Sequence, residues 1–299
     1  MAHDVTPELR QWIVDQAAAG QQPEALLRAM VQAGWAQDLA ASALDEHLPG
    51  GSATQPLAPA LASAVLPARV RAGVGFGSRV PDLDLSAGSR ELDAGDRRVQ
   101  VLASLQSPRV VVLGGVLSEA ECDALVDAAR PRLVRSRTVQ TLTGGEELNA
   151  DRTSSGMFFN RGETALIQRI EARIARLLRW PVENGEGLQV LNYLPGAEYK
   201  PHYDYFDPAE PGTSSLLQRG GQRVATLLLY LNEPERGGGT TFPDAGLEVA
   251  PHRGHAVFFS YDQPSPATRT LHGGAPVMAG EKWVATKWLR EREFNCLPQ

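Results

Sequence analysis

From residue 187 to the C-terminus the chain consists of short apolar segments separated by glycine and proline. These segments are rich in β-branched and aromatic residues and too short for typical helices, so we interpret them as strands. The predicted strands cover residues 188–193, 199–205, 223–231, 247–250, 255–261, 268–272 and 282–289. Many short strands at this spacing are typical of a β-sandwich or a jelly roll.

The segment before these strands is mainly helical. Val110–Leu113 is a short apolar strand. Ser118 and Glu121 have the spacing of a capping box, and the helix that they start carries Cys122 on its apolar face, which predicts a core position for this thiol. A second amphipathic helix covers about 163–179. Helices followed by strands favour an α+β fold in which the helices support one sheet.

The first 97 residues differ from the rest in pattern. Residues 1–48 contain three short apolar-periodic segments and predict a small helical N-terminal bundle, which is either a docking module or a structural appendage. Residues 49–97 form a linker and irregular lead-in, since proline, alanine, glycine and serine dominate their first part. We therefore expect the main domain to span 98–299.

Composition excludes several classes of protein. The formal net charge of −6 does not favour a general nucleic-acid binder. No apolar run approaches the roughly 18–20 residues that cross a bilayer, and the N-terminus has no signal-peptide pattern. Two cysteines cannot build a disulfide framework. We expect a cytoplasmic protein with no nucleic-acid or membrane partner, and the sequence leaves its oligomeric state open.

His202 and Asp204 form the first chemical motif. On a strand, side chains at positions i and i+2 point to the same face, so an imidazole and a carboxylate would project together. His272, at the end of another predicted strand, supplies a candidate third ligand. Two histidines and one carboxylate form the facial triad of non-haem Fe(II) oxygenases, which leaves coordination positions open.

Lys282 is the second motif. The chain has only three lysines, Lys200, Lys282 and Lys287, and Lys282 stands among apolar and aromatic neighbours on a predicted strand. Burying an unpaired ammonium is costly, so a lysine that points into a barrel needs an anionic partner. A dicarboxylate co-substrate would supply one.

Several ordered motifs resemble one known family, the prolyl 4-hydroxylase group of the 2-oxoglutarate- and Fe(II)-dependent dioxygenases. The matching segments are PRVVVLGGVLSEAECDALVDAA, DRTSSGMFF, LQVLNYLPGAEYKPHYDYF, GGQRVATLLLYLN, GGGTTFP and LHGGAPVMAGEKWVATKWL. The resemblance covers roughly residues 98–292 and not the N-terminal helices. It implies a double-stranded β-helix, or jelly roll, with flanking helices, and makes 98–299 the catalytic domain.

The resemblance also assigns roles to individual residues. It implies an iron site formed by His202, Asp204 and His272. It implies a 2-oxoglutarate site formed by Lys282, Tyr193 and Thr226. It implies substrate-facing positions at Tyr199, Arg223 and Trp288. Fe(II), 2-oxoglutarate and O₂ are the implied cofactor and co-substrates, and ascorbate is a further candidate cofactor.

Some assignments leave alternatives open. Arg223 is either a substrate contact or a structural ion-pair partner. Animal collagen-modifying enzymes carry a histidine eight residues after the lysine, where this chain has Arg290, so a close match in substrate handling does not follow. His252 and His255 could suggest a second metal pair, but we interpret them as structural or exposed. The irregular segments 140–162 and 205–221 are either lids or plain surface loops.

Three functions follow from these motifs. The first is a 2-oxoglutarate-dependent dioxygenase that hydroxylates a prolyl residue in a protein or peptide and releases succinate and CO₂. The second is the same chemistry on a free amino acid or another small molecule. The third is a non-catalytic jelly-roll binding module, against which the complete set of His202, Asp204, His272 and Lys282 argues.

Overall fold

A computed structural model of the chain describes residues 80–86, 88, 90–135, 138–139, 146–147 and 153–295. Nearer the N-terminus it describes six helical positions, Ile13, Pro23, Leu26, Leu27, Ala43 and Leu44. The chain divides into two compact units, Met1–Gly73 and Val74–Gln299. Apart from those six positions, the predicted bundle at 1–48 lies outside the described residues, as does the linker up to residue 79, so the account below concerns the second unit.

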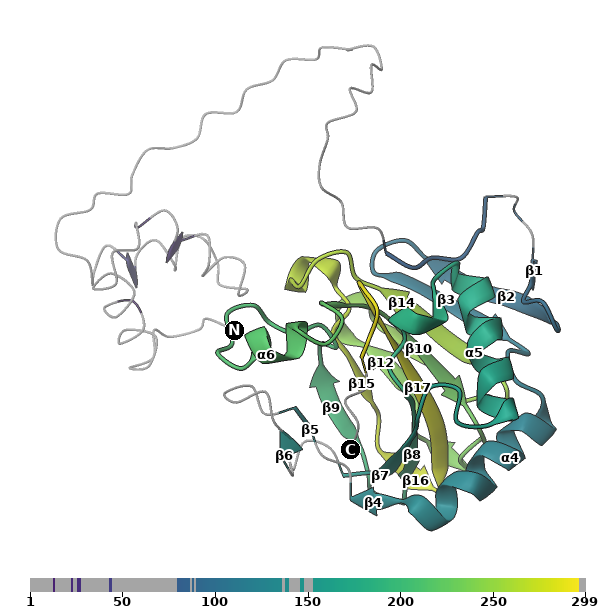
Figure 1. Ribbon diagram of the computed structural model, residues 1–299. Helices are drawn as coiled ribbons and strands as arrows, with labels where there is room; N and C mark the ends of the chain where they lie inside the picture. The colour runs from purple at the N-terminus through teal and green to yellow at the C-terminus, as the bar shows by residue number, and fades with distance from the viewer. Residues whose placement is uncertain are drawn as a thin grey trace. The chain divides into compact units, whose positions relative to one another are not determined.

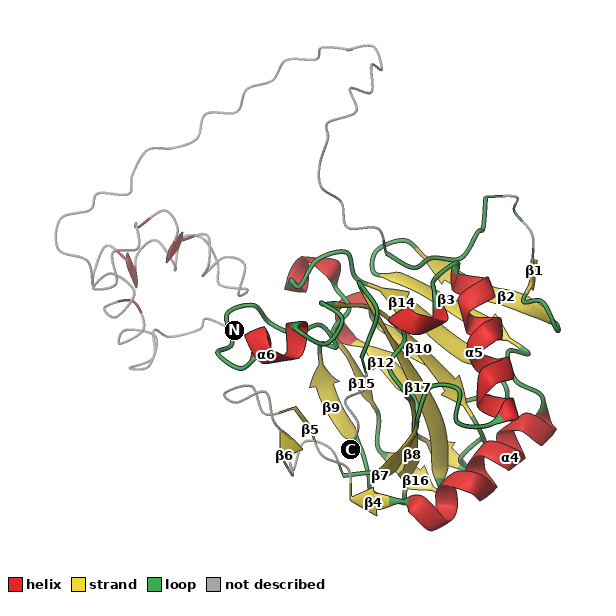
Figure 2. Cartoon of the chain, viewed as in Figure 1, coloured by secondary structure: helices red, strands yellow, loops and turns green. Residues whose placement is uncertain are grey.

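The larger sheet of the described residues has nine antiparallel strands (Figures 1 and 2). In spatial order they are β1 (Glu91–Asp93), β2 (Arg98–Leu105), β3 (Arg109–Gly114), β14 (Ala256–Ser260), β10 (Arg223–Tyr230), β17 (Lys282–Arg290), β8 (Leu188–Tyr193), β7 (Ser155–Phe159) and β4 (Val134–Arg135). The central strands β8 and β17 are buried along their whole length, as expected for strands covered on both faces.

A smaller antiparallel sheet faces the larger one. Its strands, in spatial order, are β13 (Leu247–Val249), β12 (Thr240–Phe242), β15 (His272–Gly274) and β9 (Tyr199–His202). Aromatic rings fill the space between the sheets, where Phe242 of β12 meets Phe259 of β14 edge to face at 5.3 Å between centroids. The remaining described strands form two small antiparallel pairs. One pairs β11 (Arg236–Gly237) with β16 (Val277–Ala279), and the other pairs β5 (Thr138–Val139) with β6 (Glu146–Glu147). Two facing antiparallel sheets are the core that a jelly roll requires.

Two helices cover the outer face of the larger sheet (Figure 2). Helix α4 (Glu119–Ala129) begins at the predicted capping box of Ser118 and Glu121 and buries Cys122 completely, as expected. Helix α5 (Ala165–Leu178) packs its apolar face on the same core. The shorter helices are η1 (Arg130–Arg132), η2 (Val182–Asn184), α6 (Thr213–Leu217), η3 (Pro243–Ala245) and η4 (Pro266–Thr268). The predicted α+β arrangement with flanking helices is confirmed.

The predicted boundaries differ from the structure in three places. The larger sheet starts before residue 98, because β1 pairs with β2. The predicted strand 268–272 begins only at His272, because η4 and the left-handed backbone of Arg269 (φ 55°) occupy the residues before it. Strand β9 ends at His202 instead of continuing to 205. No helix among the described residues has the length and apolarity to cross a membrane.

Candidate active site

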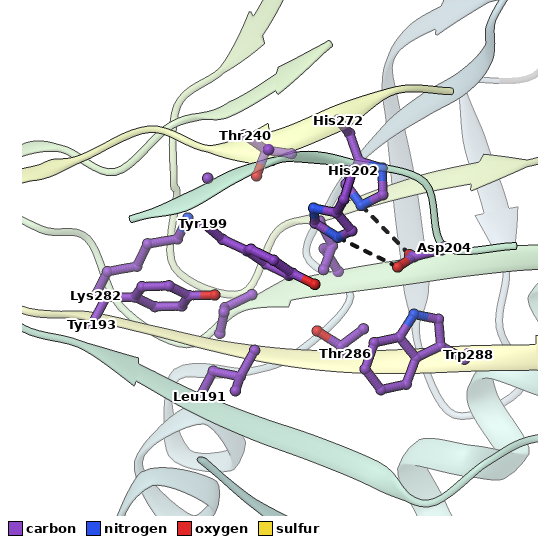
Figure 3. Close-up of a pocket in the computed structure, with 14 residues that line it drawn as sticks. Leu191, Tyr193, Tyr199, His202, Asp204, Thr240, His272, Lys282, Thr286 and Trp288 are labelled. Atoms are coloured by element: carbon purple, nitrogen blue, oxygen red, sulfur yellow. Dashed lines mark ion pairs between the residues drawn. The ribbon is translucent and has the colours of Figure 1, made fainter. Parts of the chain in front are cut away.

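The structure brings His202, Asp204 and His272 together between the two sheets (Figure 3). His202 and His272 are cross-strand partners in β9 and β15. Asp204 follows the end of β9, so a bend in the chain, and not the strand alternation that we predicted, places its carboxylate beside both rings. Its two oxygens lie 3.5 Å from His202 Nε2 and 3.5 Å from His272 Nε2. Within the described residues, this is the only metal-capable group of three or more histidine, cysteine or acidic side chains.

Both imidazoles are oriented by their own backbone. His202 Nδ1 lies 2.9 Å from the carbonyl oxygen of Lys200, and His272 Nδ1 lies 2.9 Å from that of Thr270. A carbonyl oxygen only accepts, so each Nδ1 carries a proton, and each Nε2 faces the Asp204 carboxylate. Burial lowers the pKa of His272 to about 4, which keeps this ring neutral. Neutral imidazoles held in this way are the form that binds a metal ion.

The Asp204 carboxylate completes the donor set. Burial by itself would raise its pKa, but His272, His202 and Arg223 together lower the pKa below the usual range, so the group is ionised. Thr226 donates a hydrogen bond of 2.7 Å to its Oδ2. Two imidazoles and one carboxylate on one side of a cavity fit an Fe(II) ion with open positions.

A pocket extends from these three residues to Lys282 (Figure 3). Lys282 is the cross-strand partner of Tyr193, and its Nζ lies 5.5 Å from the Tyr193 ring centroid and 5.9 Å from that of Tyr230. Its side chain is 4% exposed, its ammonium pairs with no carboxylate of a described residue, and burial lowers its pKa to about 8. A buried cation without a counter-charge fits the distal carboxylate of a dicarboxylate such as 2-oxoglutarate.

Comparisons with known proteins agree with this geometry. Residues 188–290 match the family model of the 2OG-Fe(II) oxygenase superfamily. Prolyl 4-hydroxylase 5 of Arabidopsis thaliana is 40% identical over 233 residues, which cover 71% of this chain and 77% of that protein. Prolyl 4-hydroxylase 1 of the same plant is 45% identical over 204 residues, covering 62% and 70%. The chain belongs to the prolyl 4-hydroxylase family.

A collagen prolyl hydroxylase of Paramecium bursaria Chlorella virus-1, solved as a 2-oxoglutarate complex, is 32% identical to this chain. The alignment covers 60% of this chain and 94% of the viral one, with a TM-score of 0.47.

Membership makes this protein a 2-oxoglutarate- and Fe(II)-dependent dioxygenase. Fe(II) bound by His202, Asp204 and His272 would supply the activation of O₂ that couples oxidative decarboxylation of 2-oxoglutarate to hydroxylation of a C–H bond. Lys282 would hold the distal carboxylate of the co-substrate, with the Tyr193 ring beside it. Ascorbate stays a prediction.

Two of the three predicted substrate-facing residues lie in the pocket wall. Tyr199 stacks on His202 with ring centroids 3.7 Å apart, and an irregularity in the β15–β9 register, between His272 and Gly274, allows this contact. The Trp288 indole is buried, and its Nε1 has no hydrogen-bond partner among the described residues. An indole donor without a partner at the edge of a pocket is available to a ligand.

Arg223 forms a structural ion pair, one of the two roles considered above, and is not among the residues that line the pocket. Its Nε and Nη2 donate to the two carboxylate oxygens of Glu186 at 2.7 and 2.9 Å, and its guanidinium lies 4.0 Å from the Trp288 ring centroid. Arg290 pairs with the same carboxylate at 2.8 Å. Arg223 therefore lies against the Trp288 ring with Nε and Nη2 engaged by Glu186, and its predicted contact with substrate stays a prediction.

Thr226 contacts the metal end of the site. Its hydroxyl bonds to Asp204 at the metal end of the site and contacts Tyr261, whereas Lys282 stands at the other end of the pocket. The predicted role of Thr226 in binding 2-oxoglutarate stays a prediction, and the structure adds that its hydroxyl contacts the carboxylate of Asp204. A threonine on a strand gives no local signal of the cross-strand neighbour that it meets.

Sequence reasoning missed several pocket residues. They are Leu191, Leu228, Thr240, Gly273, Gly274, Val284 and Thr286. Strand alternation from Lys282 would have found Val284 and Thr286, because both share its face of β17. His252 instead pairs with Glu233 at the surface, at 2.7 Å, and joins no metal-capable group. Much of the predicted lid 140–162 lies outside the described residues, and the 205–221 segment contains α6.

Proposed function

We propose that this enzyme hydroxylates a prolyl residue within a protein or peptide at ring carbon 4, with succinate and CO₂ as co-products. The observation that carries the proposal is the 40–45% identity to proteins named prolyl 4-hydroxylases over most of the catalytic unit. The substrate class is carried over from these relatives together with the chemistry of the pocket.

The pocket wall suits a pyrrolidine ring. The Tyr199 ring and the Trp288 indole both line the metal end of the cavity, and aromatic faces pack well on a flat apolar ring. The unpartnered Nε1 of Trp288 can donate to a carbonyl of the substrate, so the same side chain can contact both the ring and the backbone of a peptide.

The charged residues near the pocket favour a peptide over a free amino acid. A free amino acid needs a cation for its carboxylate and an acceptor for its ammonium. Arg223 and Arg290 both pair with the carboxylate of Glu186, so their charges are already matched by the chain. A prolyl residue inside a chain carries neither charge and needs no such partner.

Product analysis on matched substrates tests the proposal. The full chain, with Fe(II) and 2-oxoglutarate, is offered proline-containing peptides, the same peptides with alanine in place of proline, and free L-proline. We expect succinate release and the mass gain of one oxygen atom with proline peptides alone, and amino-acid analysis should find 4-hydroxyproline. Asp204→Ala is the inactive control. Hydroxylation of free proline without activity on any peptide would overturn the substrate class and leave the oxygenase chemistry intact.

A further inference from the structure

The pocket has a charged group at each end, and neither group stands in the interior of a strand (Figure 3). Asp204 lies two residues beyond the end of β9, in a bend of the chain. Lys282 is the first residue of β17. The ends of regular elements open more easily than their interiors, so each charged group needs further support to keep its place.

Gln222 supports the metal end of the pocket with its side-chain amide. Its Oε1 accepts a hydrogen bond of 2.7 Å from the Phe206 backbone N–H, and its Nε2 donates to the Phe206 carbonyl oxygen at 2.8 Å. Both side chains are buried. Two paired residues of an antiparallel ladder exchange the same two kinds of bond. The Gln222 amide therefore holds Phe206, which follows Asp204 by two positions, as a strand partner would.

Asn232 supports the lysine end in a similar way. Its Oδ1 accepts a hydrogen bond of 2.7 Å from the Trp283 backbone N–H, and its Nδ2 donates to the Glu281 carbonyl oxygen at 2.8 Å. These two backbone groups stand directly after and directly before Lys282 in the chain. One amide thus restrains the backbone on both sides of the buried ammonium residue.

Both amides belong to the two ends of one strand. Gln222 directly precedes β10, and Asn232 follows its last residue by two positions. Strand β10 lies inside the larger sheet, between β14 and β17. The backbone of Gln222 is itself fixed, because its N–H donates to the Glu291 carboxylate at 2.9 Å and its carbonyl oxygen accepts from the Glu291 N–H at 3.0 Å. A paired strand therefore connects the two supports.

We propose that Gln222 and Asn232 are positioning residues, one for each end of the co-substrate pocket. Gln222 places Asp204, and Asn232 places Lys282, each through the backbone beside the charged residue. A co-substrate that binds at both ends needs both groups in place at once, because a small misplacement of a binding group is costly. The inference rests on the oxygenase chemistry of the family and not on the proposed prolyl substrate.

Metal affinity tests the Gln222 end. Mn(II) titration of the full chain, followed by electron paramagnetic resonance without 2-oxoglutarate, gives the Kd. Gln222→Met keeps the size of the side chain and removes both bonds, so we expect about 10- to 100-fold weaker Mn(II) binding. Asn232→Leu is the matched control and should keep the wild-type Kd. In an Asp204→Ala background, Gln222→Met should cause no further loss, because it acts through Asp204.

Co-substrate selectivity tests the Asn232 end. The readout is the KM for 2-oxopentanoate, which has the same chain length without the distal carboxylate, divided by the KM for 2-oxoglutarate at saturating Fe(II). Asn232→Leu should lower this ratio about 10- to 100-fold, since Lys282 loses its fixed place. Gln222→Met should leave the ratio unchanged. In a Lys282→Met background, Asn232→Leu should have no further effect on the ratio.

The crossed pattern separates positioning from general loosening of the fold. Each variant loses two hydrogen bonds, so thermal melts should show similar losses of stability while the two readouts differ. Three results would overturn the inference: a wild-type Mn(II) Kd in Gln222→Met, a wild-type KM ratio in Asn232→Leu, or equal changes of both readouts in both variants.

A second pair of variants keeps the test decisive if the first pair does not fold. Gln222→Asn and Asn232→Ser keep a shorter polar side chain, and they should show the same crossed pattern with smaller effects. Failure of the wild-type chain to bind Mn(II) would contradict the metal chemistry of the family itself. Failure to hydroxylate prolyl peptides would contradict only the proposed substrate and leave this inference standing.

Discussion

The two faces of strand β17 each bury a lysine, and the two lysines differ in one respect. Lys282 is 4% exposed and Lys287 is 2% exposed, and their odd separation sends them to opposite faces of the sheet. Lys287 points toward α5, where its Nζ lies 2.5 Å from the Glu171 carboxylate and also donates to the Glu186 carbonyl. Lys282 points into the pocket and pairs with no carboxylate of the described chain.

This difference separates a structural charge from a binding charge. Burial lowers the pKa of both ammonium groups, and at Lys287 the Glu171 carboxylate opposes that effect. At Lys282 burial is the only cause of the shift. A charge whose counter-ion comes from the chain stabilises the fold, whereas a charge without one is relieved only when an anion binds. The four predictions below test this contrast.

The largest effect should come from Lys282→Met. Loss of one partner of a buried ion pair costs about 3–5 kcal/mol, so we expect the KM for 2-oxoglutarate to rise more than about a hundredfold. Steady-state CO₂ release measures it. The wild type should strongly prefer 2-oxoglutarate to a 2-oxo acid without the distal carboxylate, and the variant should lose this preference. An unchanged KM would mean that another cation holds the distal carboxylate.

Lys287→Ala should act on stability instead. It leaves Glu171 buried without its counter-charge, so the free energy of unfolding should fall by about 3–5 kcal/mol in denaturant titrations. The KM for 2-oxoglutarate should not change. Replacing the pair together, as Lys287→Met with Glu171→Leu, should recover most of the loss because no unpaired charge remains. A large increase in KM for Lys287→Ala would contradict the contrast between the two faces.

The protein without co-substrate should gain stability from Lys282→Met. The folded-state pKa of Lys282, about 8, lies below its ordinary value of 10.5, so the folded state carries an unrelieved charge at pH 7. Removing that charge should raise the free energy of unfolding by up to about 3 kcal/mol, the equivalent of this shift. For the wild type, stability should increase as the pH rises from about 8 toward 10.5, where only the unfolded state still binds the proton. Thermal melts across this range check both statements.

The smallest effect is the pH dependence of co-substrate binding. With a pKa of about 8, Lys282 is mostly charged at pH 7 and mostly neutral at pH 9. Only the charged form attracts the distal carboxylate, so the apparent KM for 2-oxoglutarate should rise about tenfold between these pH values. Lys282→Arg, whose side chain stays protonated, should show no such rise. If the KM of the wild type for 2-oxoglutarate does not change with pH, the charge of Lys282 does not contribute to co-substrate binding.

Local pattern predicted much of the fold and part of the site. The spans of β8, β10, β14 and β17 lie within a residue of the predicted strands, because apolar and β-branched runs bounded by glycine or proline depend on neighbouring residues alone. The capping box of α4 was predictable for the same reason. Lys282 was found because a lysine among apolar neighbours is unusual in this chain.

Partner choice was not predictable in the same way. Arg223 was expected near the substrate and pairs with Glu186. Glu186 lies two residues before β8 and far from Arg223 in sequence. Thr226 was expected at 2-oxoglutarate and bonds to Asp204. Each outcome depends on how segments that are distant in sequence pack together, and nothing in the local sequence around these residues encodes it.

The sequence by itself determined which residue types could do the chemistry and in which segments of the chain they lie. His202, Asp204, His272 and Lys282 follow from motifs that are readable one segment at a time. Only the tertiary structure decided which of the many arginines and acidic residues neutralise one another, and so which charge was left for a ligand. The physical reason is that the cost of a buried charge depends on what lies within a few ångströms in space, and those neighbours come from other strands and helices.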